Sequence, residues 1–98
     1  MAIREISCDA IRAAAAQLCI ESNCNLPADV RAALERAREA ERSELCREIL
    51  GDLLENADIA RREHIPICQD TGMAVIFAEI GQDVHFVGGG FENAAAKA

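Results

Sequence analysis

The chain changes from helical to strand-like sequence at one stretch, Pro66-Ile67-Cys68-Gln69-Asp70-Thr71-Gly72-Met73. Pro66 has a fixed φ and disfavours helical geometry at Ile65, so a preceding helix must end there. Gly72 permits a bend before the apolar residues that follow. Residues 68–71 are therefore predicted to form a loop between a helix and a strand. This loop brings a thiol, an amide, a carboxylate and a hydroxyl into one turn.

Three amphipathic helices are predicted upstream of the loop, each with apolar residues at intervals of three and four. The first follows a cap at Ser7, the second begins near Ala28 after Pro27, and the third follows a cap at Ser43. The second helix also carries charges of opposite sign at helical spacings, which are typical of a solvated face.

A β-hairpin is predicted downstream of the loop. Met73–Ala78 is apolar at both alternating sets of positions, as in a strand that is covered on both sides. Gly81-Gln82-Asp83 is a turn signal, and Val84–Val87 resumes with alternation. Because an isolated hairpin is marginal in water, we expect this one to belong to a larger sheet in the full-length protein. The predicted fold class is α+β, with about three N-terminal helices followed by the hairpin.

Length and charge limit the possible functions. The 98 residues are expected to form a single domain, 1–98, and their net charge of −7 argues against nucleic acid or an anionic membrane surface as a partner. The N-terminus lacks the apolar stretch of a signal peptide, and no apolar run approaches the roughly 20 residues that cross a bilayer. A cytoplasmic protein is expected.

The cysteine pattern fits neither a disulfide framework nor a zinc ribbon, because the number is odd and no C-x-x-C pair occurs. The five cysteines are Cys8, Cys19, Cys24, Cys46 and Cys68. Free thiols in a reducing compartment are the simpler interpretation. Cys19 and Cys46 lie within helical apolar patterns, where a cysteine usually acts as a small buried hydrophobe.

The chemistry of the loop has several interpretations from its residues alone. Cys68 can be an inert packing residue, a nucleophile served by His64 or His85, or a ligand of a soft metal or an iron–sulfur cluster. Gln69 can donate and accept hydrogen bonds, and Asp70 can take or give a proton, as at the rim of a polar substrate pocket. Equally, Asp70 can simply cap a turn.

A family resemblance separates these interpretations. It is carried by four stretches, Leu26–Val30, Leu53–Ala57, Pro66–Val75 and Glu79–His85. Together they resemble the N-terminal catalytic region, of the α-subunit type, of class I iron–sulfur-dependent fumarate hydratases. Members of that type include the closely similar L(+)-tartrate dehydratases, so the resemblance indicates a family rather than one substrate.

The resemblance implies a [4Fe–4S] cluster held by three cysteines, with one iron left open to act as a Lewis acid on a dicarboxylate. By position in the motif, Cys68 is one of the three ligands. Gln69 and Asp70 contact the substrate, and Asp70 transfers a proton at the carbon beside the carboxylate. The expected reaction is the reversible hydration of fumarate to malate or the dehydration of L-tartrate.

The resemblance also implies missing parts. In the family, the other two cluster cysteines and the basic residues that bind substrate lie beyond the position of Ala98, so the chain is expected to be C-terminally truncated and inactive alone. A β-type subunit or domain and homodimerisation are expected in the complete enzyme. The alternative is a non-catalytic helical interaction module or docking fragment. A zinc or redox protein is a third interpretation, against which the cysteine spacing counts.

Overall fold

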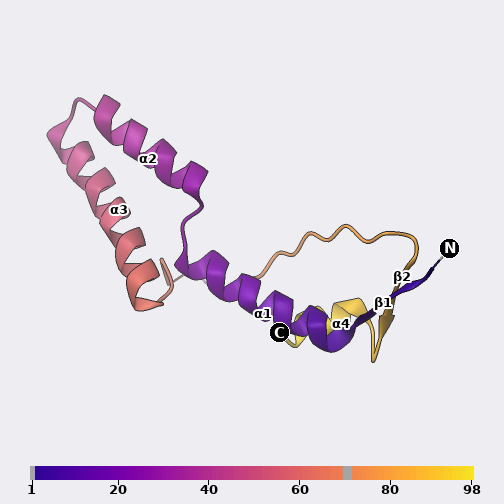
Figure 1. Ribbon diagram of the computed structural model, residues 1–98. Helices are drawn as coiled ribbons and strands as arrows, with labels where there is room; N and C mark the ends of the chain where they lie inside the picture. The colour runs from indigo at the N-terminus through magenta and orange to yellow at the C-terminus, as the bar shows by residue number, and fades with distance from the viewer. Residues whose placement is uncertain (1, 70–71) are drawn as a thin grey trace. The chain divides into compact units, whose positions relative to one another are not determined.

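A computed structural model describes residues 2–69 and 72–98 of the chain. It confirms the α+β class. The elements are β1 (Arg4–Ser7), α1 (Cys8–Cys24), α2 (Ala28–Ala40), α3 (Glu44–Glu63), β2 (Val84–Val87) and α4 (Phe91–Ala96), as Figure 1 shows. They fall into two compact units, Glu21–Gly72 and a second one formed by Met1–Ile20 with Met73–Ala98. The expectation of a single domain, 1–98, stays a prediction.

The Glu21–Gly72 unit contains α2 packed against α3. Its core is a row of small and branched side chains on one face of α3, where Leu54, Ala57 and Ala60 are buried at three-residue spacing. The predicted cap is confirmed: the Ser43 hydroxyl accepts a hydrogen bond from the Cys46 backbone N–H at 3.4 Å. Among the described residues, no helix is long and apolar enough to cross a membrane.

The other unit contains a two-stranded sheet in which β1 and β2 run parallel. Ile6 lies opposite Phe86 in the ladder, and the Phe86 ring packs on Phe91 with centroids 5.4 Å apart. Cys8 at the start of α1 and Ala94 in α4 are buried. Phe86 of the sheet therefore packs against the first residue of α4.

The predicted β-hairpin is wrong, although its second strand exists. Val84–Val87 pairs with the N-terminal Arg4–Ser7 instead of Met73–Ala78, which forms no strand. A strand that is apolar on both faces is stable only when other elements cover both faces. Val75 and Phe77 are exposed in this structure, so that cover is lacking and no strand forms. β2 pairs with β1 instead, and Ile6 and Phe86 lie opposite each other in the ladder. Both side chains are half-buried, so this two-stranded sheet needs cover on one face only.

Candidate functional site

The end of α3 sets the position of the Cys68 loop. His64 adopts the left-handed conformation, with φ of 56°, and its backbone N–H bonds the Ala60 carbonyl, while the Ile65 N–H reaches the same carbonyl at 3.1 Å. This is how many helices end when the next residues cannot continue them, and Pro66 follows at once. The predicted stop before Pro66 is confirmed.

Two hydrogen bonds then hold the residue before Cys68. The Ile67 N–H donates to the Asn23 carbonyl at 2.8 Å, and the Ile67 carbonyl accepts from the Asn56 side-chain amide at 2.7 Å. The backbone N–H and the carbonyl of Ile67 are therefore both hydrogen-bonded, and both partners belong to the Glu21–Gly72 unit. Asn56 positions the loop, a role that the sequence pattern did not reveal because its partner is a backbone atom eleven residues away.

The described part of the loop presents its side chains to solvent. Cys68 and Gln69 are both exposed, and Gly72 has open space where a Cβ would lie. Asp70 and Thr71 lie outside the described residues. Accessible Cys68 and Gln69 are available to a ligand, which an inert packing cysteine would not be.

The other cysteines differ from the sequence prediction in one respect. Cys46 is exposed and is not a buried hydrophobe, because it lies in the first turn of α3, more than two turns before the buried residues Leu54, Ala57 and Ala60. Cys8 and Cys24 are buried instead, and Cys19 is half-buried. All five cysteines are thiols in this structure.

A three-cysteine cluster requires ligand side chains that lie close together in space. Among residues 2–69 and 72–98, no three His, Cys, Asp or Glu side chains lie close enough together to hold a metal ion. The complete ligand set therefore does not fit within the described chain. Cys68 fits as a single contributing ligand, since its thiol is exposed at the end of a well-held backbone segment.

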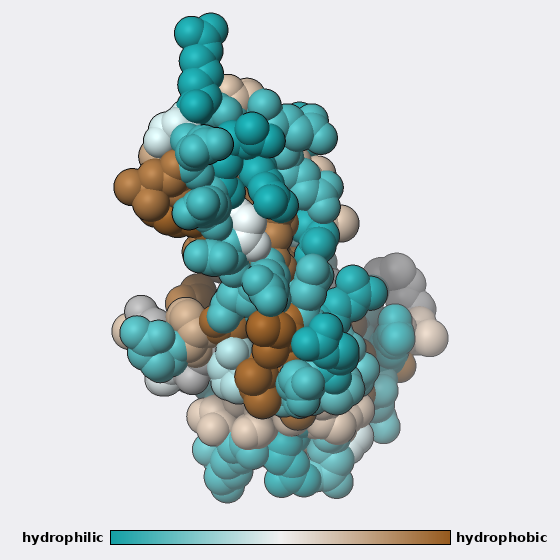
Figure 2. All heavy atoms as spheres, turned by 90° about the vertical axis from the view of Figure 1, so that its left-hand side faces the viewer, coloured by the Kyte–Doolittle hydropathy of each residue, from teal (hydrophilic) through white to brown (hydrophobic). Residues whose placement is uncertain are grey.

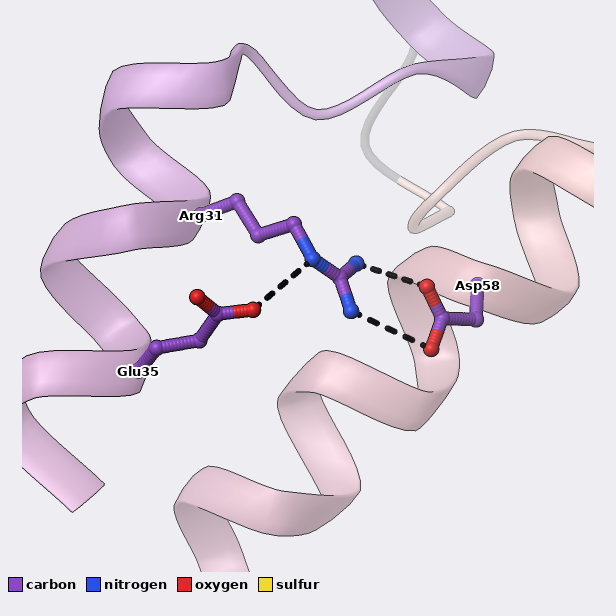
Figure 3. A network of polar contacts seen from close by, with 3 residues as sticks. All are labelled: Arg31, Glu35 and Asp58. Carbon is purple, nitrogen blue, oxygen red and sulfur yellow. Dashed lines mark hydrogen bonds and ion pairs between the residues drawn. The ribbon is translucent and has the colours of Figure 1, made fainter. Parts of the chain in front are cut away.

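A charged network joins α2 to α3 within the same unit, as Figure 3 shows. The Arg31 guanidinium donates to both Asp58 carboxylate oxygens, at 2.6 and 3.3 Å, and its Nε donates to Glu35 at 3.1 Å. Hydrogen bonding from Arg31 lowers the pKa of Asp58 and in turn raises the pKa of Arg31. The predicted solvated face of α2 is thus a bridge between helices, which leaves Arg31 poorly placed to bind a substrate carboxylate.

This network predicts a pH-dependent stability. Because the folded-state pKa of Asp58 is lowered, its contribution is complete above the unfolded-state pKa and is lost as the pH falls through the folded-state value. Asp58→Asn should lower the midpoint of thermal unfolding by a few degrees at neutral pH, and the gap to the wild type should close in acid. The pair is half-exposed, so salt should also shrink the effect.

Circular dichroism melts across pH would measure this difference. Asp52→Asn, a carboxylate change on the same helix, is the matched control and should leave the midpoint near that of the wild type. An Asp58→Asn deficit that persisted unchanged at low pH would contradict the ion-pair explanation.

The surface of α2 and α3 has a hollow, which is a second candidate site. Its walls carry the basic residues Arg38 and Arg47 together with the acidic residues Glu39 and Glu48. In Figure 2 the visible surface is mainly hydrophilic, interrupted by separate apolar areas. Because both signs of charge line the hollow, it offers no selective site for a dicarboxylate.

Comparison with known proteins matches residues 12–98 to the family described as fumarate hydratase (fumerase). The match covers the whole Glu21–Gly72 unit, which includes the loop, and most of the other unit, and the chain therefore belongs to the fumarate hydratase family. This result confirms the family that the four matching stretches of sequence indicated.

Two relatives illustrate the match. A protein of Methanocaldococcus jannaschii, provisionally named L(+)-tartrate dehydratase subunit alpha, is 40% identical over 65 residues, or 66% of this chain and 23% of the relative. The aerobic class I fumarate hydratase of Escherichia coli K12 is 39% identical over 71 residues, or 72% of this chain and 13% of the enzyme. The chain thus spans less than a quarter of these relatives. No solved structure matches it.

Proposed function

We propose that the chain forms part of an iron–sulfur hydro-lyase that interconverts fumarate and malate or dehydrates L-tartrate. The family match carries this proposal, since the relatives are named as a fumarate hydratase and a tartrate dehydratase. The exposed Cys68 and Gln69, on a loop held through Ile67, support it. The substrate is accordingly a small dicarboxylate.

Each loop residue has a proposed task. Cys68 provides one of three thiolate ligands to a [4Fe–4S] cluster, which when bound supplies a Lewis-acidic iron with an open position. Gln69 orients the substrate, because its amide can donate to a carboxylate and accept from a hydroxyl. Asp70 exchanges the proton at the carbon beside the carboxylate, while the hydroxyl is added to or removed from the neighbouring carbon.

The remaining parts are proposed to come from polypeptide outside these 98 residues. The described residues gather no three-ligand metal site, and the matched relatives are more than four times as long as their aligned segments. Two further cysteines, the basic residues for the carboxylates, a β-type subunit or domain and homodimerisation would belong to the complete enzyme. Thiol cysteines throughout suit a reducing compartment such as the cytosol.

A chimera tests the proposed function. Residues 12–98 of this chain would replace the matching segment of the Escherichia coli fumarate hydratase, followed by anaerobic reconstitution with iron and sulfide and an assay of fumarate hydration. We expect the chimera to retain a cluster and to hydrate fumarate, whereas the isolated chain does neither. A soluble chimera that holds its cluster but neither hydrates fumarate nor dehydrates L-tartrate would refute the proposal.

A non-catalytic docking fragment is the second candidate, favoured by one observation. Met73, Val75 and Phe77 leave a large apolar surface exposed. The chimera separates the two functions, because a docking fragment has no reason to restore a cluster or turnover in the Escherichia coli enzyme.

A further inference from the structure

Ile67 is the last residue with a hydrogen-bonded main chain before Cys68. Its N–H donates to the Asn23 carbonyl at 2.8 Å, and its carbonyl accepts a hydrogen bond from the Asn56 side-chain amide at 2.7 Å. Beyond these two contacts, no backbone–backbone hydrogen bond joins residues 68–80 to another described residue. The hydrogen bond from Asn56 is therefore the last hold on the main chain before the Cys68 thiol.

This contact holds the peptide group that joins Ile67 to Cys68. Because a peptide group is planar, the Ile67 carbonyl lies in one plane with the backbone nitrogen and the Cα of Cys68. A hydrogen bond to the carbonyl oxygen therefore restricts rotation of that plane, and with it the position of the Cys68 Cα. Only φ and χ1 of Cys68 remain as soft rotations between this plane and the sulfur.

The contact needs a hydrogen-bond donor at position 56. A carbonyl oxygen can only accept, so the amide nitrogen of Asn56 must face it. An aspartate of nearly the same size would bring a carboxylate oxygen against the carbonyl, where two acceptors repel each other. Asn56 is otherwise exposed, while Leu54 and Ala57 of α3 are buried. Its side chain therefore serves the loop and not the core of the unit.

We infer that Asn56 is a positioning residue for Cys68, because it fixes the Ile67 carbonyl and so holds the thiol in place for the iron–sulfur cluster. The inference rests on the proposed function, since it gives Asn56 a task at one ligand of the proposed cluster. A thiolate on a fixed backbone rebinds iron soon after the bond breaks, whereas one on a loose backbone moves away. Removal of a partner that orients a metal ligand typically weakens metal binding about 10–100-fold.

Hydrogen exchange in the 98-residue chain, measured residue by residue by NMR, tests the contact itself. Asn56→Asp should speed exchange of the Ile67 N–H by about tenfold, because the carbonyl of the same residue is released and the segment opens more often. The midpoint of thermal unfolding should stay within a few degrees of the wild type, since a substitution at an exposed position changes stability little.

Asn25→Asp is the matched control for this experiment. Asn25 is a second exposed asparagine in the same unit, and its side chain makes no hydrogen bond to another described residue. The substitution adds the same negative charge without removing a contact, so exchange at Ile67 should not change. Asn56→Gln keeps the donor group, and its exchange should stay within about threefold of the wild type.

Loss of iron from the chimera tests the positioning role, and the visible absorbance of the cluster follows it in the presence of an iron chelator. Asn56→Asp should lose its iron about 10–100-fold faster than the parent chimera. Asn56→Gln and Asn25→Asp should lose it at nearly the parental rate. A merely structural role for Asn56 would lower the unfolding midpoint instead.

The outcomes separate this inference from the proposed function. A parent chimera that binds no cluster would overturn both. With a parent that keeps its cluster, unchanged exchange at Ile67 or unchanged iron loss in Asn56→Asp would overturn the inference alone. An equal effect in Asn25→Asp, or an Asn56→Gln variant as impaired as Asn56→Asp, would overturn it as well.

Discussion

Cys68→Ser in the chimera should yield a folded protein that cannot keep its cluster. A serine hydroxyl stays protonated near neutral pH, whereas a thiol readily provides the soft, deprotonated ligand that an iron–sulfur cluster requires. With one of three protein ligands lost, iron content should fall to background after desalting, and the visible absorbance of the cluster should disappear. Fumarate hydration should drop at least about a thousandfold, since Lewis-acid assistance supplies several kcal/mol to such a reaction.

Cys46→Ser is the matched control for this experiment. Cys46 is a second exposed thiol in the same unit, and only its backbone N–H takes part in the Ser43 cap, so the substitution leaves that cap intact. This variant should keep its iron and its activity. Unchanged iron content and absorbance in Cys68→Ser would remove Cys68 from the ligand set, and an equal loss in Cys46→Ser would point to general damage by the substitution.

Local signals explain why the helices could be predicted. Ser43 caps α3 through a hydrogen bond within one turn, and Pro66 ends the helical region through a clash with its own neighbour. Both effects act over a few residues and are therefore readable from sequence. The pairing of Arg4–Ser7 with Val84–Val87 spans most of the chain, and two four-residue strands carry too little pattern to identify each other.

In the candidate site, too, the local features could be predicted from the sequence and the longer-range contacts could not. Residue types in the loop indicated Cys68, Gln69 and Asp70, and the structure adds that the first two are exposed. The role of Asn56 could not be predicted, because an asparagine on a helix gives no sign of which carbonyl it will meet. Cys46 was misplaced because an apolar stripe does not show how far along a helix the packed part of that stripe extends.

Asp70→Asn in the chimera should separate cluster binding from catalysis. Asparagine has nearly the same size and can still accept and donate hydrogen bonds, but it cannot exchange a proton. Loss of a general acid–base group typically slows turnover by about 10²–10⁴-fold, and we expect kcat to fall within that range while iron content stays at the level of the parent chimera. The limb of the pH–rate profile that reports this carboxylate should disappear as well.

Asp52→Asn provides the comparison for that change, because Asp52 is an exposed carboxylate on α3 outside the loop. It should leave kcat, iron content and the pH profile as they are. A purely turn-capping Asp70 would give a different pattern: asparagine is an equally good cap, so activity would remain near that of the parent chimera. Parental turnover in Asp70→Asn would therefore exclude the proton-transfer role, and lost iron in that variant would show that Asp70 supports the cluster rather than the chemistry.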